Sequence, residues 1–177
     1  GISFFWYLND FDAMVRQAFP DDPEGKTFWD LKPLTNADGR NGIKGIGYDL
    51  VCPRDGYKHC SVVDAVFCHG HSKKATMFLS WVWGYTFMEV RTALSDWQSK
   101  NPGEHFLWWC YYCNNQFRMD TAQVSAAELV DTFGDQLRKV GRMLTLMDDA
   151  LAPRYAKRLW CLFEIFVAEK DDIPVQA

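Results

Sequence analysis

Residues 155–164 read Tyr-Ala-Lys-Arg-Leu-Trp-Cys-Leu-Phe-Glu. Their apolar spacing predicts a helix from Tyr155 to Glu169, entered after Pro153. Glu164 stands out in this helix, because two apolar residues precede it and three follow it. A carboxylate in such a run must face solvent, find a partner or line a cleft, since burying it unpaired costs free energy. Lining a cleft would give the helix a function.

Strands and helices alternate in the sequence around this stretch. Apolar runs predict strands at 76–82 and 142–147, an aromatic strand at 105–113 and the start of another strand at 173–175. Helical spacing predicts helices at 87–98 and 126–140. Ser125 is expected to cap the helix at 126–140, and Gly141 to end it. The alternation predicts an α/β fold with a parallel sheet flanked by helices and right-handed crossovers.

The first 75 residues differ from the rest in composition and in periodicity. They are rich in Gly, Pro, Asp and Asn, and only Asp10 to Ala18 has clear helical spacing. Ser61 to Cys68 fits a strand or a short helix, and the pattern does not decide between them. We therefore expect residues 1–75 to form an irregular extension that packs on an α/β domain at 76–177. Because the last strand begins as the chain ends, that domain is expected to be incomplete at its C-terminal end.

Composition narrows the classes of function. The net charge of −4 argues against general nucleic-acid binding, which needs a basic face. Aromatic residues make up 16% of the chain, which favours a heavily packed core or a docking surface. No apolar run is long enough to span a bilayer, so a transmembrane helix is not expected, while peripheral membrane association stays open. Several of the six cysteines lie in apolar runs, which favours a reducing compartment such as the cytoplasm or an organelle interior.

Candidate site residues follow from the expected sheet. In an open α/β sheet, ligands bind beyond the carboxyl ends of the strands. The first strand ends in Ser80-Trp81-Val82-Trp83, the second in Asn114-Asn115-Gln116 and the third in Asp148-Asp149. Indoles, carboxamides and Glu164 would suit a nucleotide or ribose, and a carboxylate can stabilise an oxocarbenium ion.

Each of these residues also has an ordinary structural interpretation. Trp81 and Trp83 could be core rings, Asn114 to Gln116 and the two aspartates could be turn residues, and Glu164 could pair with a nearby cation. Cys60, Cys68, His69 and His71 have side chains that bind zinc, but their spacing matches no standard zinc site, so no metal is expected. Cys110 and Cys113 end a predicted strand, which argues against a thioredoxin-like redox pair.

Residues 76–175 resemble the TIR-like domains of unicellular algae, which are related to Toll/interleukin-receptor domains. Phe78-Leu79-Ser80-Trp81 is similar to the first strand of that family, and Tyr155, Trp160, Cys161 and Glu164 match its Tyr…Trp-Cys-x-x-Glu box. Cys52-Pro53-Arg54-Asp55-Gly56 and Cys113-Asn114-Asn115-Gln116 resemble further signatures of the algal group. The resemblance implies a flavodoxin-like fold.

Three functions stay open here, of which the resemblance implies the first two, while the missing chain end and the many aromatic residues would suit the third. The first is an interaction or assembly module that binds copies of itself or other proteins. The second is an NAD glycohydrolase with Glu164 as its catalytic carboxylate, NAD as substrate and Ser80, Trp81, Trp83, Asn114, Asn115, Gln116 and Trp160 as binding residues. The third is a non-catalytic subunit of a large, organellar or membrane-associated complex. Ala152 and Arg158 replace the usual serines of the box, which favours the non-catalytic roles, and no cofactor is expected.

Overall fold

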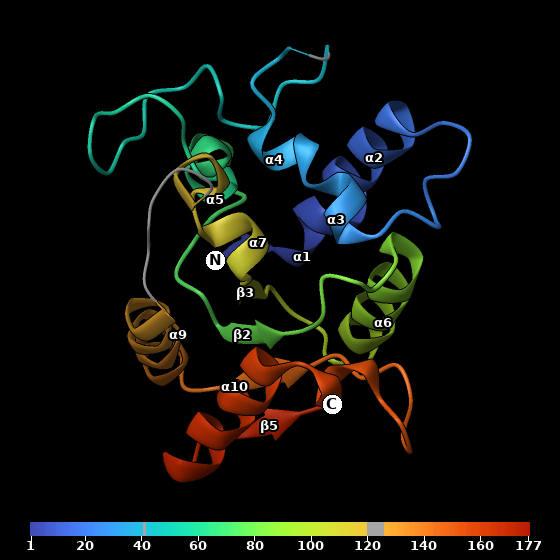
Figure 1. Ribbon diagram of the computed structural model, residues 1–177, viewed down its shortest axis with the longest axis vertical. Helices are drawn as coiled ribbons and strands as arrows, with labels where there is room; N and C mark the ends of the chain where they lie inside the picture. The colour runs from blue at the N-terminus through green and yellow to red at the C-terminus, as the bar shows by residue number, and fades with distance from the viewer. Residues whose placement is uncertain (41, 120–125) are drawn as a thin grey trace.

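A five-stranded mixed sheet forms the centre of the molecule (Figure 1). The computed structural model describes residues 1–40, 42–119 and 126–177. The strand order is β1 (Ile2–Ser3), β3 (Phe106–Trp108), β2 (Met77–Ser80), β4 (Met143–Thr145) and β5 (Val175–Gln176). Strands β3, β2, β4 and β5 are parallel, and β1 pairs with β3 in the antiparallel direction. The predicted α/β class is confirmed, although the sheet carries an antiparallel edge strand that the sequence pattern did not reveal.

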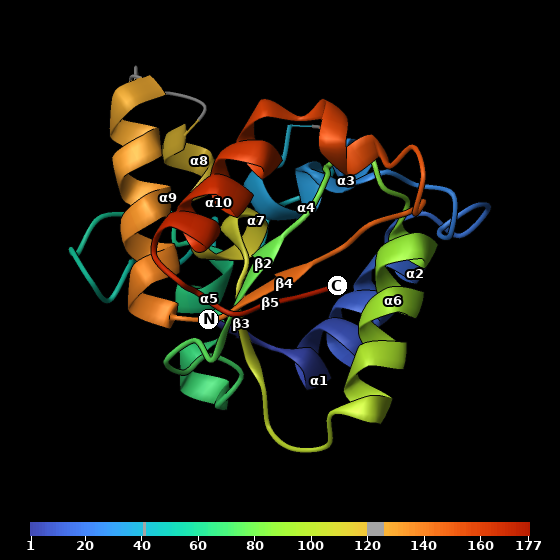
Figure 2. The same ribbon diagram turned by 90° about the horizontal axis from the view of Figure 1, so that it is seen from below.

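Three longer helices cover the two faces of the sheet. Figure 2 shows α9 (Ala126–Val140) and α10 (Leu159–Lys170) on one face and α6 (Phe87–Lys100) on the other. A capping box between Thr86 and Glu89 starts α6, because each side chain accepts a hydrogen bond from the other's backbone N–H. Gly141 ends α9 with a φ of 72°, a left-handed conformation that glycine adopts readily. The predicted cap at Ser125 lies outside the described residues.

The predicted strand at 105–113 is wrong in its second half. Only β3 is extended, and α7 (Cys110–Cys113) follows directly, with α8 (Gln116–Met119) after it. The N–H of Cys113 donates to the carbonyl of Trp109 at 2.8 Å, which closes the turn. Because every residue of this run is apolar or aromatic, the sequence shows neither the two-residue period of a strand nor the 3.6-residue period of a helix.

The predicted helix at 155–169 is also corrected. A 3₁₀ turn, η3 (Arg154–Lys157), precedes α10, and the two are separated at Arg158. Arg158 has extended backbone, with φ −107° and ψ 116°, so Tyr155 is not on the helix that carries Glu164. The break turns the ring of Tyr155 into the core, where it is buried.

The first 75 residues contribute an edge strand and a large part of the core. Their short elements are α1 (Phe4–Trp6), the π-helix η1 (Tyr7–Phe11), α2 (Asp12–Ala18), α3 (Phe28–Leu31), α4 (Pro33–Asn36), α5 (Val62–Ala65) and the 3₁₀-helix η2 (Phe67–His69). The ambiguous segment at 61–68 is therefore helical, with Ser61 as the N-cap of α5. Phe28 packs edge-on against Trp81 at 4.5 Å between ring centroids, which joins this region to the sheet.

Two hydrophobic clusters lie on the two faces of the sheet. Phe78 and Trp108 stack at 4.7 Å and belong to the cluster beneath α9 and α10. Leu79 and Leu107 belong to the larger cluster with the rings of the N-terminal region. Both faces of β2, β3 and β4 are covered, which explains why these three strands read as continuous apolar runs rather than alternating ones.

Candidate functional site

A cavity of about 210 Å³ lies beyond the carboxyl ends of β2 and β3. Four indoles line it, together with polar side chains from three other segments: Trp29, Trp81, Trp83, Trp160, Asn114, Gln116, Arg158 and Glu164. Its position agrees with the rule that open α/β sheets bind ligands at this edge. Of the residues predicted to bind or cleave NAD, all except Ser80 and Asn115 line the cavity, and the strand-end residues Asp148 and Asp149 do not.

Glu164 is the carboxylate of this cavity, and it is only 6% exposed. It sits on the face of α10 that packs against the sheet, and its Oε2 accepts a hydrogen bond from the hydroxyl of Ser80 at the end of β2. That hydroxyl also shares a hydrogen bond with the hydroxyl of Tyr155. Among the described residues, the second oxygen of Glu164, Oε1, has no hydrogen-bond partner. One oxygen is therefore anchored and the other is left for a ligand.

Burial raises the pKa of Glu164 from 4.5 to about 8, and the hydrogen bond from Ser80 only partly offsets the rise. Removing a carboxylate from water disfavours its charged form. At neutral pH, Glu164 is therefore mostly protonated. A cation placed against it would lower its pKa and favour the carboxylate.

The indole rings of Trp29, Trp83 and Trp81 lie next to one another in the lining of the cavity. The rings of Trp81 and Trp83 lie 6.1 Å apart and are stacked, and Trp29 from α3 lies 4.7 Å from Trp83. Trp81 is buried, and its Nε1–H approaches the thiol of Cys110 without finding a hydrogen-bond partner among the described residues. An unpaired N–H in such a place is costly, and a ligand acceptor could satisfy it.

Trp160 and Arg158 close the side of the cavity formed by α9 and α10. The ring of Trp160 lies 5.8 Å from that of Phe133 on α9. Arg158 is half-buried in the break between η3 and α10, and it lines the cavity. A guanidinium at this edge suits a phosphate or carboxylate group.

Two thiols also line the cavity, but they are not nucleophiles. Burial and the nearby Glu164 raise the pKa of Cys110 and of Cys161 to about 12. The Cys161 thiol donates to the carbonyl of Trp81 at 3.3 Å. Because the reactive form of cysteine is the thiolate, both residues stay inert at neutral pH.

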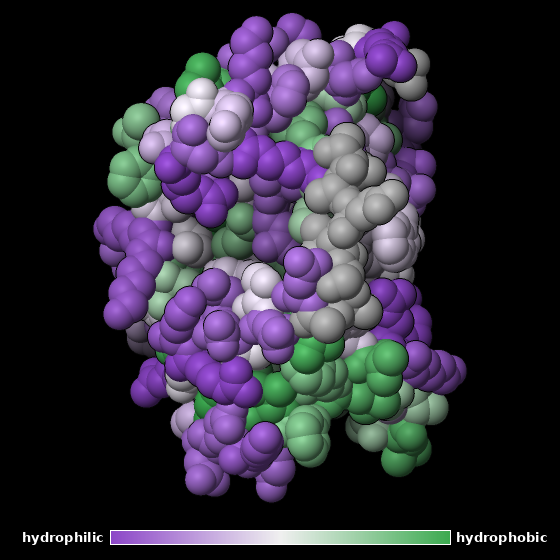
Figure 3. All heavy atoms as spheres, turned by 60° about the vertical axis from the view of Figure 1, so that its left-hand side comes forward, coloured by the Kyte–Doolittle hydropathy of each residue, from purple (hydrophilic) through white to green (hydrophobic). Residues whose placement is uncertain are grey.

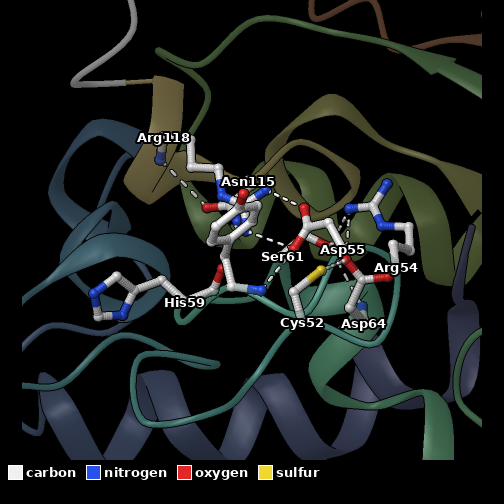
Figure 4. Close-up of polar contacts among 9 residues, drawn as sticks. Cys52, Arg54, Asp55, His59, Ser61, Asp64, Asn115 and Arg118 are labelled. Atoms are coloured by element: carbon white, nitrogen blue, oxygen red, sulfur yellow. Dashed lines mark hydrogen bonds and ion pairs between the residues drawn. The ribbon is translucent and has the colours of Figure 1, made fainter.

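The three carboxamides after α7 have different roles. Asn114 lines the cavity, whereas the Nε2 of Gln116 is used internally, donating to the carbonyls of Cys110 and Tyr111 at 3.1 Å each. Asn115 does not line the cavity and donates to the carbonyl of His59 at 2.6 Å (Figure 4). The side-chain oxygen of Asn115 accepts from the N–H of Arg118, which is turn chemistry.

Figure 4 shows that the segments carrying two of the sequence signatures meet. Arg118 of α8 forms a bidentate ion pair with Asp55, which holds the pKa of that carboxyl well below its usual range. Arg54 pairs with Asp64 of α5, whose carboxylate also accepts from Ser61 at 2.6 Å. The ion pair between Asp55 and Arg118 thus ties the segment 52–56 to the segment 113–118, of which Asn114 and Gln116 line the cavity.

The loop after β4 holds the strand ends together rather than facing the cavity. Asp148 accepts from the hydroxyl of Tyr85 and from the guanidinium of Arg154. Arg154 also pairs with Glu89 and donates to the carbonyl of Gly84 at 3.0 Å. Asp149 accepts from two backbone N–H groups of its own turn. The turn interpretation of these aspartates therefore describes their contacts.

The described part of the chain contains no group of three or more His, Cys, Asp or Glu side chains arranged to hold a metal ion, so Cys60, Cys68, His69 and His71 do not gather. All six cysteines are free thiols. Within the described ranges, no helix is long and apolar enough to cross a bilayer.

Sequence reasoning missed Trp29, Cys110 and Phe133 as cavity residues. Thr27 and Asp30 form a capping box, and that spacing was the available signal for the short helix that carries Trp29. Cys110 had no such signal, because it was placed in the part of the predicted strand at 105–113 that is helical. Phe133 lies on the predicted apolar face of α9, where core and cavity residues look alike.

A scan of protein-family models found no match to this chain, and searches of curated proteins and of solved structures found none either.

Proposed function

We propose that the cavity binds the nicotinamide-ribose end of NAD, and that Glu164 promotes cleavage of the bond between them. The observation that carries the proposal is the free oxygen of Glu164 in a cavity walled by indoles. Indoles stack on flat rings and attract cations, and the nicotinamide of NAD is both flat and cationic. The cavity is smaller than the roughly 300–1,000 Å³ of sites that enclose drug-sized ligands, so the adenine end would extend past Trp29 and Arg158.

The chemistry follows from the pKa of Glu164. A pyridinium cation stacked on Trp81 or Trp83 would lower that pKa, so the substrate itself would produce the carboxylate. The bond between the ribose C1′ and the ring nitrogen breaks, and its electron pair neutralises the pyridinium. The carboxylate stabilises the positive charge that develops at C1′. Water then adds to C1′ and releases a proton, which gives ADP-ribose and nicotinamide.

We also propose that the domain is TIR-like and flavodoxin-like. The order of the four parallel strands in the sheet supports this. If these strands are numbered along the chain, their order across the sheet is second, first, third and fourth, as in doubly wound sheets of the flavodoxin type. In such sheets the ligand lies where the order reverses. Ser80 ends β2, one of the two strands at that point, and Glu164 bonds to Ser80, while the cavity extends from β2 toward β3 rather than β4.

Release of nicotinamide from NAD tests the proposed function. The purified chain should release it, and Glu164→Gln should reduce the rate by at least about a hundredfold, in the range lost with one transition-state-stabilising group. Glu169→Gln is the matched control, because Glu169 lies on the same helix but is exposed. Equal rates for the two variants would exclude Glu164 as the catalytic carboxylate.

An assembly role is the second candidate, because α10 leaves large apolar side chains in solvent. Leu159, Leu162 and Phe166 are 79%, 46% and 62% exposed. Such side chains on one face mark docking surfaces more often than isolated exposed residues do. The size of the protein in native extract distinguishes a small assembly module from a subunit of a large complex. A lone species of about 20 kDa, the mass of the chain, would count against a subunit of a large complex.

A further inference from the structure

Arg158 is a half-buried cation that has no anionic partner among the described residues. It lines the cavity at the start of α10, where its side chain forms no ion pair and no hydrogen bond with the described part of the chain. Every other arginine except exposed Arg142 pairs with an aspartate or a glutamate. Taking a cation partly out of water costs free energy unless an anion compensates it. The position of Arg158 therefore favours an anionic ligand.

The helix that follows Arg158 does not supply this anion. Figure 3 shows hydrophobic side chains gathered on the lower part of the surface, at the level where α9 and α10 lie in Figure 1. Leu159 and Leu162 are the exposed residues that come next on α10, and its first turn contains no acidic residue. Within the described ranges no side chain compensates Arg158, which leaves that role to a ligand of the cavity.

Among the described residues, the cavity lining contains one cation and one carboxyl group, Arg158 and Glu164, and they do not pair. Burial and the hydrogen bond from Ser80 set the pKa of Glu164, without a contribution from Arg158. Burial raises the pKa of Cys161 to about 12, and here the charge of Arg158 opposes the rise. The cation and the carboxyl group thus have separate surroundings, so they would meet different parts of one ligand.

The first turn of α10 adds backbone donors beside Arg158. Arg158 is the N-cap residue of this helix, and its side chain has no acceptor for the first N–H groups. Such N–H groups have no partner within the helix, and their partial positive charge favours anions. Trp160 and Cys161 of this turn line the cavity, as does the unpaired oxygen-bearing side chain of Glu164. A phosphate at this end would meet the guanidinium and uncapped backbone N–H groups together.

The separation of Arg158 and Glu164 fits a ribose 5′-phosphate. The two residues are six positions apart, which is about 9 Å along the helix axis. In the proposed complex the free oxygen of Glu164 faces C1′ of the ribose. The 5′-phosphate lies at the other end of the sugar, across the ring and one methylene group. Contacts of about 3 Å at each end then bring the phosphate within reach of Arg158.

We propose that Arg158 and the first turn of α10 form a phosphate subsite, through which the cavity selects nicotinamide nucleotides over nicotinamide riboside. The inference rests on the proposed cleavage of NAD and names the part of the substrate that sets its class. The reacting bond lies at C1′, away from the phosphate, so the phosphate contacts are the same before and during bond cleavage. Arg158 is therefore a specificity-determining residue that acts on KM, whereas Glu164 acts on kcat.

Nicotinamide release from NAD, nicotinamide mononucleotide and nicotinamide riboside tests the subsite. For the wild-type chain, kcat/KM for the mononucleotide should exceed that for the riboside at least about tenfold, as expected of hydrogen bonds between charged groups. Arg158→Gln should remove this difference by raising KM for NAD and the mononucleotide, and leave kcat/KM for the riboside unchanged. Arg142→Gln is the matched control, because Arg142 is exposed and lies outside the cavity lining, and it should keep the wild-type preference.

Arg158→Lys separates charge from geometry. It should keep part of the preference, because an ammonium group attracts phosphate but cannot bind two of its oxygens in one plane. Equal kcat/KM for the mononucleotide and the riboside in the wild-type chain would overturn the proposal. An equal loss for both substrates in Arg158→Gln would also overturn it, since a merely structural role has that effect.

Binding of ribose 5-phosphate distinguishes this inference from the proposed function. Calorimetry on the wild-type chain should detect ribose 5-phosphate but not ribose, and Arg158→Gln should weaken that binding at least about tenfold. If none of the three substrates releases nicotinamide, the proposed cleavage fails, and this measurement alone decides the subsite. Ribose 5-phosphate that binds no better to the wild-type chain than to Arg158→Gln would then overturn it.

Discussion

The hydroxyl of Ser80 donates to the carboxylate of Glu164, across 84 residues of sequence. Ser80 ends the first parallel strand, and Glu164 lies on the last helix. This hydrogen bond fixes one carboxylate oxygen at the centre of the sheet edge and leaves the other toward the cavity. The position of Glu164 thus depends on the whole α/β framework rather than on its own helix.

Removing the hydroxyl of Ser80 should change both stability and the titration of Glu164. In Ser80→Ala the buried carboxyl loses its only side-chain hydrogen bond among the described residues, which costs about 1–3 kcal/mol. Because that bond lowers the pKa of Glu164, its loss should raise the pKa further. Urea unfolding and the pH dependence of nicotinamide release measure the two effects. Thr145→Val, at the paired position of β4, should leave the pH dependence unchanged.

The raised pKa of Glu164 predicts a pH-dependent difference in stability. Between pH 4.5 and about 8 the folded chain keeps the proton that the unfolded chain has lost. Stability therefore falls as pH rises through this window, by about 1.4 kcal/mol per pH unit from this one group. Glu164→Gln lacks the penalty, so its stability relative to wild type should increase from pH 5 to pH 8. Denaturant unfolding at several pH values would contradict this if the difference were constant.

Trp29 should contribute to ligand affinity but little to folding. It is 52% exposed, and its ring lies tilted against that of Trp83 in the cavity lining. Loss of one stacking indole costs about 1–3 kcal/mol in other aromatic binding sites. Trp29→Ala should therefore weaken NAD binding about five- to a hundredfold, measured by calorimetry in the Glu164→Gln background. Phe5→Ala, also at an exposed ring, is the control that should bind normally.

Arg154 should be a major stabilising residue outside the hydrophobic core. Its guanidinium pairs with Asp148 and Glu89 and lies 4.7 Å from the centre of the Tyr85 ring. Arg154→Ala should lower the free energy of unfolding by about 1–3 kcal/mol, because several partners lose their contacts together. Arg154→Lys should not restore stability, since the single ammonium group of lysine cannot replace the planar guanidinium and its several N–H donors. Arg40→Ala, at an exposed ion pair, should change stability by less than about 0.5 kcal/mol.

Much of the fold could be predicted because strand and helix periods were distinct in the C-terminal half. The strand at 76–82, the helices at 87–98 and 126–140 and the strand at 142–147 all correspond to elements of the structure. The aromatic run at 105–113 could not be divided, since a fully buried strand and a buried helical turn share one apolar pattern. The edge strand β1 has only two residues, too few for any periodicity.

The candidate site could be predicted only for residues that the order of strands and helices along the chain, or the residues next to them in sequence, pointed out. Strand ends led to Trp81, Trp83 and Asn114, and the isolated charge in an apolar run led to Glu164. Ser80 and Tyr155 were known as motif residues, but their hydrogen bonds arise from tertiary packing between β2, η3 and α10. Asn115 shares its turn with Asn114, and only the three-dimensional path of the loop at 52–64 explains why it faces His59 instead.

The pH dependence of nicotinamide release from NAD tests the central claim most directly. Initial rates should be measured from pH 6 to pH 9.5 at NAD concentrations far below saturation, so that they report the free protein. The rate should rise with pH and level off above a pKa near 8, the value to which burial raises Glu164. Glu164→Gln should remove the rise. A wild-type rate no higher than that of Glu164→Gln at every pH would contradict the proposed function.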